Sequence, residues 1–120
     1  MIRTLGLTHV QLRVSDLARS VRFYKDAFGM EEQFREGDQV FLRTPGAQDT
    51  ITLNGEANSS SIDGGAGIEH LGFRRAQGQD LDDAIREAHA AGGKLVERGA
   101  HAPGKPFAYI ADPDGYLIEL

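Results

Sequence analysis

The sequence predicts an α+β fold made of two tandem copies of one unit, each with a strand, a helix and three further strands. Two observations lead to this class. Two amphipathic helical segments each follow a short alternating segment, and these two opening segments carry a histidine at the same place, His9 and His70. Further pairs repeat at a similar offset, namely Asp16 with Asp80, Gly29 with Gly92 and Thr52 with Glu119. The offset drifts, which indicates a duplicated unit within one domain of residues 1–120 and not a solenoid.

The first unit is expected to span residues 1–54. Residues 7–14 alternate between apolar and polar side chains, which is typical of a half-buried strand. Asp16 provides a helix N-cap, and apolar residues then follow at helical spacing until Gly29, which suits a left-handed C-cap. Three strands are expected after the helix, at 31–35, 39–43 and 50–53.

A linker rich in Ser, Gly and Asn is expected at 55–66, and the second unit at 67–120. Residues 68–74 alternate around His70, which predicts the opening strand. Asp80 caps a second amphipathic helix that ends at Gly92. The closing strands are expected at 94–97, 107–111 and 116–120.

The composition limits the classes of function. The 120-residue chain carries a net charge of -5 and its basic residues are scattered, which argues against a nucleic-acid partner. Cysteine is absent, so any metal must be held by nitrogen and oxygen ligands. There is neither an apolar leader nor an apolar run long enough to span a membrane. We therefore expect a cytoplasmic protein without membrane contact that acts on a small molecule.

Three side chains form a candidate metal site. His9 and His70 lie on the polar faces of their strands, and Glu119 lies opposite the apolar face formed by Ile118 and Leu120. A carboxylate directed toward the interior needs a partner, and a divalent cation supplies one. Two imidazoles and one carboxylate suit Fe(II), Mn(II), Ni(II) or Zn(II). The alternatives are structural histidines and a solvated carboxylate.

His101 and Tyr109 are candidates for catalysis, because the adjacent strands of a hairpin can direct both side chains toward Glu119. The alternatives are a solvated loop histidine and an aromatic side chain used only for packing. Polar residues that share strand faces with the metal candidates are candidates for substrate binding, namely Gln11, Thr52 and Arg74. For the arginine, an exposed strand charge is the alternative.

Several motifs resemble the vicinal oxygen chelate superfamily over nearly the whole chain. They are the opening Thr8-His9-Val10, the helix 16–24, Phe28-Gly29-Met30 and the closing stretch 112–120. The resemblance implies a pair of βαβββ modules that form one cup-shaped mixed sheet, with helices packed outside and with metal and substrate inside. It also implies a homodimer, because small members of the superfamily usually complete their clefts by pairing two chains.

The second unit is also similar to the signature of extradiol ring-cleaving dioxygenases. The matching positions are Gly99-Ala100-His101, Tyr109, Asp112-Pro113, Gly115 and Glu119. This similarity implies that Glu119 binds the metal, that Fe(II) is the favoured ion, and that ring cleavage of a catechol-like substrate is the leading hypothesis. Two features depart from the pattern: Ala108 replaces a larger apolar residue, and no histidine occurs between His9 and His70.

Two other functions are kept as hypotheses. Fosfomycin-resistance proteins resemble this chain in size and in their three ligands, which implies a Mn(II)-dependent glutathione or thiol transferase or lyase. A metal-free binding protein of the bleomycin-resistance type is the other hypothesis. Thr52 stands where enzymes similar to glyoxalase I have a carboxylate ligand, and this counts against an isomerase.

Overall fold

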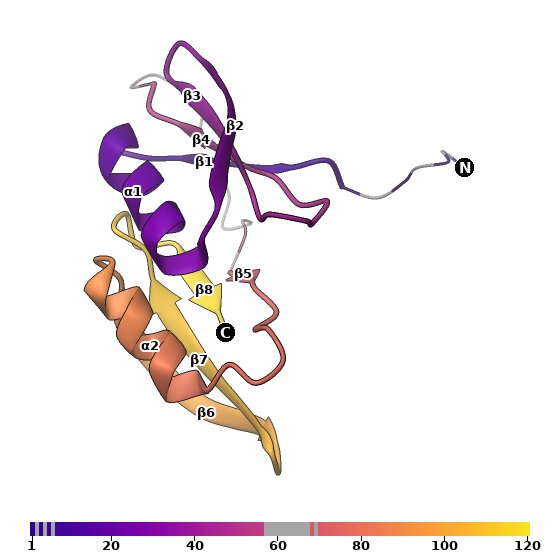
Figure 1. Cartoon of the computed structure of the whole chain (residues 1–120), viewed down its shortest axis with the longest axis vertical. Coiled ribbons are helices and arrows are strands. Elements are labelled where there is room, and N and C mark those ends of the chain that lie inside the picture. Colours follow the sequence, from indigo (N-terminus) through magenta and orange to yellow (C-terminus); the bar gives the residue numbers. More distant parts are fainter. Residues whose placement is uncertain (2, 4, 6, 57–67, 69) are drawn as a thin grey trace. The chain divides into compact units, whose positions relative to one another are not determined.

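The computed structural model describes residues 1, 3, 5, 7–56, 68 and 70–120. The chain divides into two compact units, residues Met1–Ser59 and Ser60–Leu120, which we call module one and module two. Their elements follow one another in the same order, strand, helix and three strands, as Figure 1 shows. Most of the expected linker at 55–66 lies outside the described residues. The predicted α+β class with two βαβββ modules is confirmed.

Module one forms a four-stranded mixed sheet with the order β1-β4-β3-β2. Its elements are β1 (Val10–Arg13), α1 (Leu17–Phe28), β2 (Glu31–Glu36), β3 (Gln39–Arg43) and β4 (Ile51–Asn54). β1 pairs in parallel with β4, and the other pairs are antiparallel. This arrangement makes β4 an inner strand, and all four of its residues are buried.

Helix α1 begins and ends at the residues that the sequence predicts. The Asp16 side chain accepts a hydrogen bond from the Arg19 backbone N–H, which satisfies a donor that the first turn leaves unpaired. Gly29 ends the helix with a φ of 63°, a left-handed conformation that costs glycine little. The helix packs against β4 and buries Phe23 and Tyr24, whose rings meet edge to face.

Module two repeats this architecture with the sheet order β5-β8-β7-β6. Its elements are β5 (Leu71–Gly72), α2 (Leu81–Ala90), β6 (Lys94–Ala102), β7 (Lys105–Ala111) and β8 (Leu117–Glu119). β5 pairs in parallel with β8, while β7 pairs antiparallel with both β6 and β8. In Figure 1 α2 runs along β6 and β7, the two strands against which it packs.

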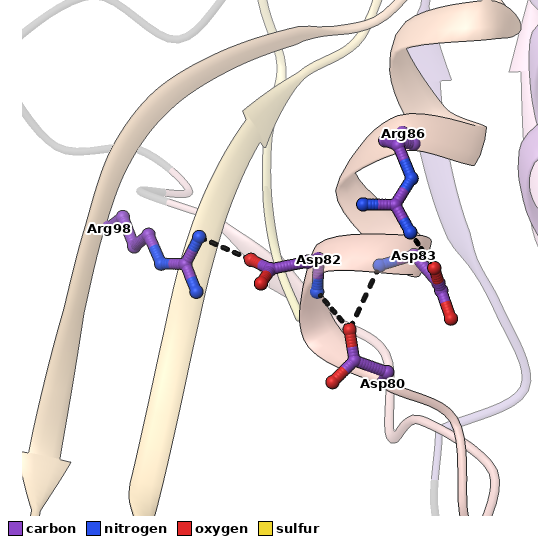
Figure 2. A network of polar contacts seen from close by, with 5 residues as sticks. All are labelled: Asp80, Asp82, Asp83, Arg86 and Arg98. Carbon is purple, nitrogen blue, oxygen red and sulfur yellow. Dashed lines mark hydrogen bonds and ion pairs between the residues drawn. The ribbon is translucent and has the colours of Figure 1, made fainter.

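Polar contacts fix the start of α2 and join it to β6 (Figure 2). The Asp80 carboxylate accepts hydrogen bonds from the backbone N–H groups of Asp82 and Asp83, as an N-cap does. The Asp82 side chain forms an ion pair with Arg98 of β6, and Asp83 pairs with Arg86 one turn further along the helix. These pairs are exposed, so they orient the helix end more than they stabilise it.

Several strands differ in length from the sequence expectation, and β6 and β5 differ the most. β6 continues to Ala102, although its expected end was residue 97, because β7 pairs with it up to a tight turn at Gly104. Glycine and alanine at 99 and 100 look like loop residues when the partner strand is unknown. β5 contains only Leu71 and Gly72, where residues 68–74 were expected. Among the described residues, no helix is long and apolar enough to cross a membrane.

Candidate metal centre and active site

The centre of the candidate site is the Glu119 carboxylate on β8, and three predicted site residues of module two surround it. The Nε2 atom of His101, on β6, lies 2.5 Å from Oε1 of Glu119. The Nε2 atom of His70, one residue before β5, lies 3.2 Å from Oε2. The Tyr109 hydroxyl, on β7, donates to the same Oε2 at 3.4 Å. The structure thus brings together His70, His101, Tyr109 and Glu119, and the hairpin pattern of the sequence predicts this for His101, Tyr109 and Glu119.

The sheet register explains why these side chains meet. Tyr109 pairs directly with Glu119, so both side chains lie on one face of the sheet. The alternate residues Ala108, Ile110 and Ile118 are fully buried on the opposite face. The apolar face therefore forms the core of module two, and the other face carries the chemical groups.

Contacts with neighbouring side chains favour the ionised form of Glu119. The hydrogen bond from His101 is the largest influence and lowers the pKa of the Glu119 carboxyl, against a smaller effect of desolvation that raises it. The charges of His101 and His70 and the hydroxyl of Tyr109 lower this pKa further. The Glu119 side chain is 24% exposed, so solvent weakens each of these contributions. The carboxylate is held in the form that binds a cation.

His70 and Glu119 fit two ligands of one divalent cation. Two donors that lie about 2.1 Å from an ion at right angles are about 3 Å apart. The 3.2 Å between Nε2 of His70 and Oε2 of Glu119 matches this separation. His101 is closer, and its Nε2 hydrogen-bonds the other carboxylate oxygen, which suits a residue that orients a ligand. Within the described parts of the chain, no group of three or more His, Asp or Glu side chains is arranged to hold a metal.

The first module has a histidine at the corresponding place. His9 immediately precedes β1 as His70 precedes β5, and its side chain is exposed. Its Nδ1 atom lies 2.8 Å from the hydroxyl of Thr8, which leaves Nε2 as the nitrogen that can bind a metal. His9 and His70, which correspond in the repeated sequence pattern, therefore also occupy corresponding positions in the two modules.

Thr52 corresponds to Glu119 in the pairing of the strands. Thr52 pairs with Gln11 of β1 and Phe41 of β3, just as Glu119 pairs with Gly72 of β5 and with Tyr109 of β7. Thr52 is fully buried, and its hydroxyl has no hydrogen-bond partner among the described residues. Module one thus has a neutral hydroxyl where module two has a carboxylate.

The other two predicted substrate-binding residues lie at the surface. Gln11 is exposed on β1, on the side opposite the buried Leu12. Arg74 is exposed two residues after β5. The position of Gln11 agrees with the alternation expected from the sequence, whereas Arg74 lies outside the strand on which it was expected.

Phe107 is a residue of the site that the sequence did not single out. Its ring stacks on the His101 imidazole, with centroids 4.3 Å apart and 22° between the planes. It also meets the Tyr109 ring edge to face at 5.4 Å. The available signal was a glycine, Gly99, opposite an aromatic residue in a hairpin, a pairing in which the ring covers the glycine.

These features of fold and site define a class of protein. The family model described as "Glyoxalase/Bleomycin resistance protein/Dioxygenase superfamily" matches residues 6–120, and the chain belongs to this superfamily. The resemblance to the vicinal oxygen chelate superfamily that the sequence motifs carry is therefore confirmed.

Curated relatives with similar sequences have different activities in their names. A manganese-dependent 2,3-dihydroxybiphenyl 1,2-dioxygenase of Geobacillus genomosp. 3 is 30% identical over 115 residues, which cover 93% of this chain and 35% of the relative. A probable lactoylglutathione lyase of Vibrio parahaemolyticus is 30% identical over 126 residues, which cover 95% of this chain and 88% of that protein. The chain spans less than half the length of several other curated relatives, including a lactoylglutathione lyase of Arabidopsis thaliana, of which it covers 42%.

Solved structures share the fold. A glyoxalase-related enzyme from Fulvimarina pelagi has a TM-score of 0.76 and 25% sequence identity, and the match covers 97% of this chain and 86% of that one. Glyoxalase I from Zea mays has a TM-score of 0.74 and 27% identity, with 94% of this chain and 43% of the maize chain covered. The superfamily thus includes metal-dependent dioxygenases and glyoxalase-type lyases.

Proposed function

We propose that the chain is a divalent-metal-dependent dioxygenase that cleaves the ring of a catechol-like substrate. The observation that carries this proposal is the arrangement around Glu119, where one carboxylate contacts His70, His101 and Tyr109 from three neighbouring segments. The similarity to a manganese-dependent 2,3-dihydroxybiphenyl 1,2-dioxygenase supports it.

The proposed metal ligands are His9, His70 and Glu119. The spacing of His70 and Glu119 suits adjacent ligands of one ion, and His9 takes the place of His70 in module one. Nitrogen and oxygen donors of this kind suit Fe(II), which we favour, or Mn(II), the metal in the name of the Geobacillus relative. When bound, such an ion acts as a Lewis acid and as a template for two adjacent substrate oxygens.

His101 is the proposed general acid and base. Its Nε2 atom lies 2.5 Å from Oε1 of Glu119, so this acid and base lies directly beside a proposed metal ligand. The imidazole side chain is 58% exposed, which allows it to exchange a proton with solvent between turnovers.

Tyr109 is the proposed hydrogen-bond donor to a substrate oxygen. Its hydroxyl lies 3.4 Å from Oε2 of Glu119, which is long for a bond between oxygens and therefore weak. A substrate oxygen next to the carboxylate would offer a shorter bond. The ring itself is held by contacts with Phe107 and His70, so the hydroxyl is directed by its neighbours.

Gln11, Thr52 and Arg74 are the proposed substrate-binding residues. The Thr52 hydroxyl is buried without a partner among the described residues, a state that costs about 1–3 kcal/mol unless another polar group satisfies it. Gln11 is its neighbour in the paired strand, and Arg74 supplies a positive charge that attracts an anionic substrate. We further propose a homodimer, since each sheet has edge strands that a second chain could cover.

A lactoylglutathione lyase activity is the second candidate. The Vibrio parahaemolyticus relative favours it, because the match covers most of both proteins. Against it stands Thr52, a neutral residue at the position that corresponds to Glu119. A lyase of the four-ligand type needs a carboxylate there, so we rank ring cleavage first.

Two assays on one preparation test the proposal. The purified protein is loaded with Fe(II) or Mn(II) under argon, its metal content is measured, and oxygen uptake is followed over a panel of catechols. We expect uptake with at least one catechol, lost in Glu119→Ala and kept in His89→Ala, a matched change at the end of α2. Lyase activity without oxygen uptake would favour the second candidate. A preparation that binds no divalent metal would refute both.

A further inference from the structure

The strand that carries His101 contains an irregularity at this residue. β6 and β7 pair regularly from Glu97 with Tyr109 to Ala100 with Pro106, and the register then shifts so that Ala102 pairs with Lys105. His101 is the extra residue of this β-bulge. A bulge changes the direction of a side chain relative to the regular pleat, and bulges are common beside active sites. The regular pleat of the strand therefore does not determine the direction of the His101 side chain. Contacts with neighbouring side chains must hold it in place.

Those contacts come from Phe107. Its ring lies against His101 with nearly parallel planes, 4.3 Å between centroids and 22° between planes. The His101 imidazole is 58% exposed. Without this stacking, several rotamers would therefore be open to the side chain. The ring of Phe107 covers one side of the imidazole while Glu119 binds its Nε2 atom.

Gly99 creates the space for that ring. It pairs with Phe107 across the hairpin, and a Cβ atom at residue 99 would lie 2.8 Å from Cζ of Phe107. Such a distance is shorter than carbon atoms tolerate, so any larger residue would displace the ring. Gly99 has no positive φ, and its small size is thus the property that this position uses.

We propose that Phe107 and Gly99 are positioning residues that hold the His101 imidazole against Glu119. Phe107 acts by stacking, and Gly99 acts by allowing the ring to lie flat across the strand. Neither side chain can hydrogen-bond the carboxylate, so both residues act through His101, and Phe107 also contacts Tyr109. The consequence for catalysis rests on the proposed function, whereas the positioning itself is a property of module two.

Nuclear magnetic resonance of the metal-free protein tests the positioning directly. The chain has four histidines, so the imidazole signals are few enough to assign. The measurement is the nuclear Overhauser contact between the His101 ring and the side-chain methylene protons of Glu119, at one fixed pH. The variants are Phe107→Leu, Phe107→Tyr and Gly99→Ala. His89, in the last turn of α2, serves as the internal control for the fold.

We expect Phe107→Leu and Gly99→Ala to lose most of this contact, while Phe107→Tyr, which keeps the ring, retains it. The amide spectrum and the His89 signals should stay as in the wild type. If Phe107→Leu keeps the contact at wild-type intensity, or if the wild type lacks it, the proposal is overturned. Should Gly99→Ala fail to fold, the two Phe107 variants still decide.

A second measurement separates this inference from the proposed function. In the metal-loaded protein, Phe107→Leu should lower oxygen uptake with the active catechol by about tenfold or more, the usual effect of losing a group that supports a metal ligand. Phe107→Tyr should restore most of the rate. A wild type without metal or activity would refute the proposed function but leave the magnetic resonance result intact. A wild-type rate in Phe107→Leu would overturn the inference alone.

Discussion

Replacing Thr52 by valine removes one buried hydroxyl group, and we expect opposite effects on the stability of the fold and on substrate binding. Valine has nearly the same shape as threonine, but it lacks the hydroxyl that is buried without a partner among the described residues. Leaving such a group unpaired costs about 1–3 kcal/mol, so its removal should raise the free energy of unfolding by about 1 kcal/mol. For a chain of 120 residues this corresponds to a rise in Tm of about 4 °C.

The assay is urea and thermal unfolding of the metal-free protein, followed by circular dichroism. Thr52→Ser is the matched control, because it keeps the hydroxyl and loses a buried methyl group, which should lower the stability by about 1 kcal/mol. The proposed role in substrate binding predicts the opposite order for function. Thr52→Val should raise the KM for the active catechol several-fold, while Thr52→Ser should change it little.

A single result refutes the reasoning. If Thr52→Val is less stable than the wild type by 1 kcal/mol or more, the hydroxyl has a partner such as a buried water, and its assignment as an unsatisfied group is wrong. If the valine variant is more stable but has an unchanged KM, the energetic argument holds and the substrate role fails.

Three further predictions concern the metal, the catalytic groups and the assembly. Metal affinity should fall as the pH is lowered, because protons compete with the metal for its ligands. Glu119→Gln should weaken metal binding without unfolding the chain. Isothermal titration calorimetry checks both expectations. His101→Ala and Tyr109→Phe should keep the metal but lose turnover, by about a hundredfold for His101, in oxygen-uptake assays; wild-type rates in both would contradict their roles. Light scattering should show a dimer, and a mass near 13.0 kDa at micromolar concentration would contradict it.

The lowered pKa of Glu119 has a defined consequence for stability. A carboxyl with a pKa below its ordinary value stabilises the folded state at pH values above that ordinary value, and this contribution disappears as the pH falls through the lowered pKa. The contacts of the ionised carboxylate with His101 should therefore weaken only in acid. Unfolding of the wild type and Glu119→Gln compared across that range should show the two stabilities converging as the pH falls.

Local signals in the sequence predicted much of the fold and part of the site. Asp16, Gly29 and Asp80 mark helix ends because capping depends on neighbouring residues only. The placement of Tyr109 and Glu119 on the faces opposite the apolar residues of their strands follows from strand alternation, which is also local. These features needed no knowledge of how distant segments pack.

The remaining features depend on contacts between strands. The length of β6 and the stacking of Phe107 on His101 follow from the hairpin register and its bulge, which the sequence does not state. Thr52 and Asn54 are also buried although they are polar, because β4 is an inner strand and all its residues are covered. The pairing of the strands determines the length of β6, the stacking of Phe107 and the burial of β4. This pairing depends on the packing of a whole module.

The hairpin between His101 and Tyr109 also restricts how this chain can change in length. Only Pro103 and Gly104 separate β6 from β7, and a shift of the pairing by one residue would turn alternate side chains to the opposite face. Deleting one residue from the turn would thus direct either the histidine or its strand partners away from Glu119. A single-residue insertion or deletion in this turn should therefore disrupt the site, whereas a substitution of Pro103 keeps the pairing of the strands. We expect homologues to keep the number of residues between His101 and Tyr109 constant.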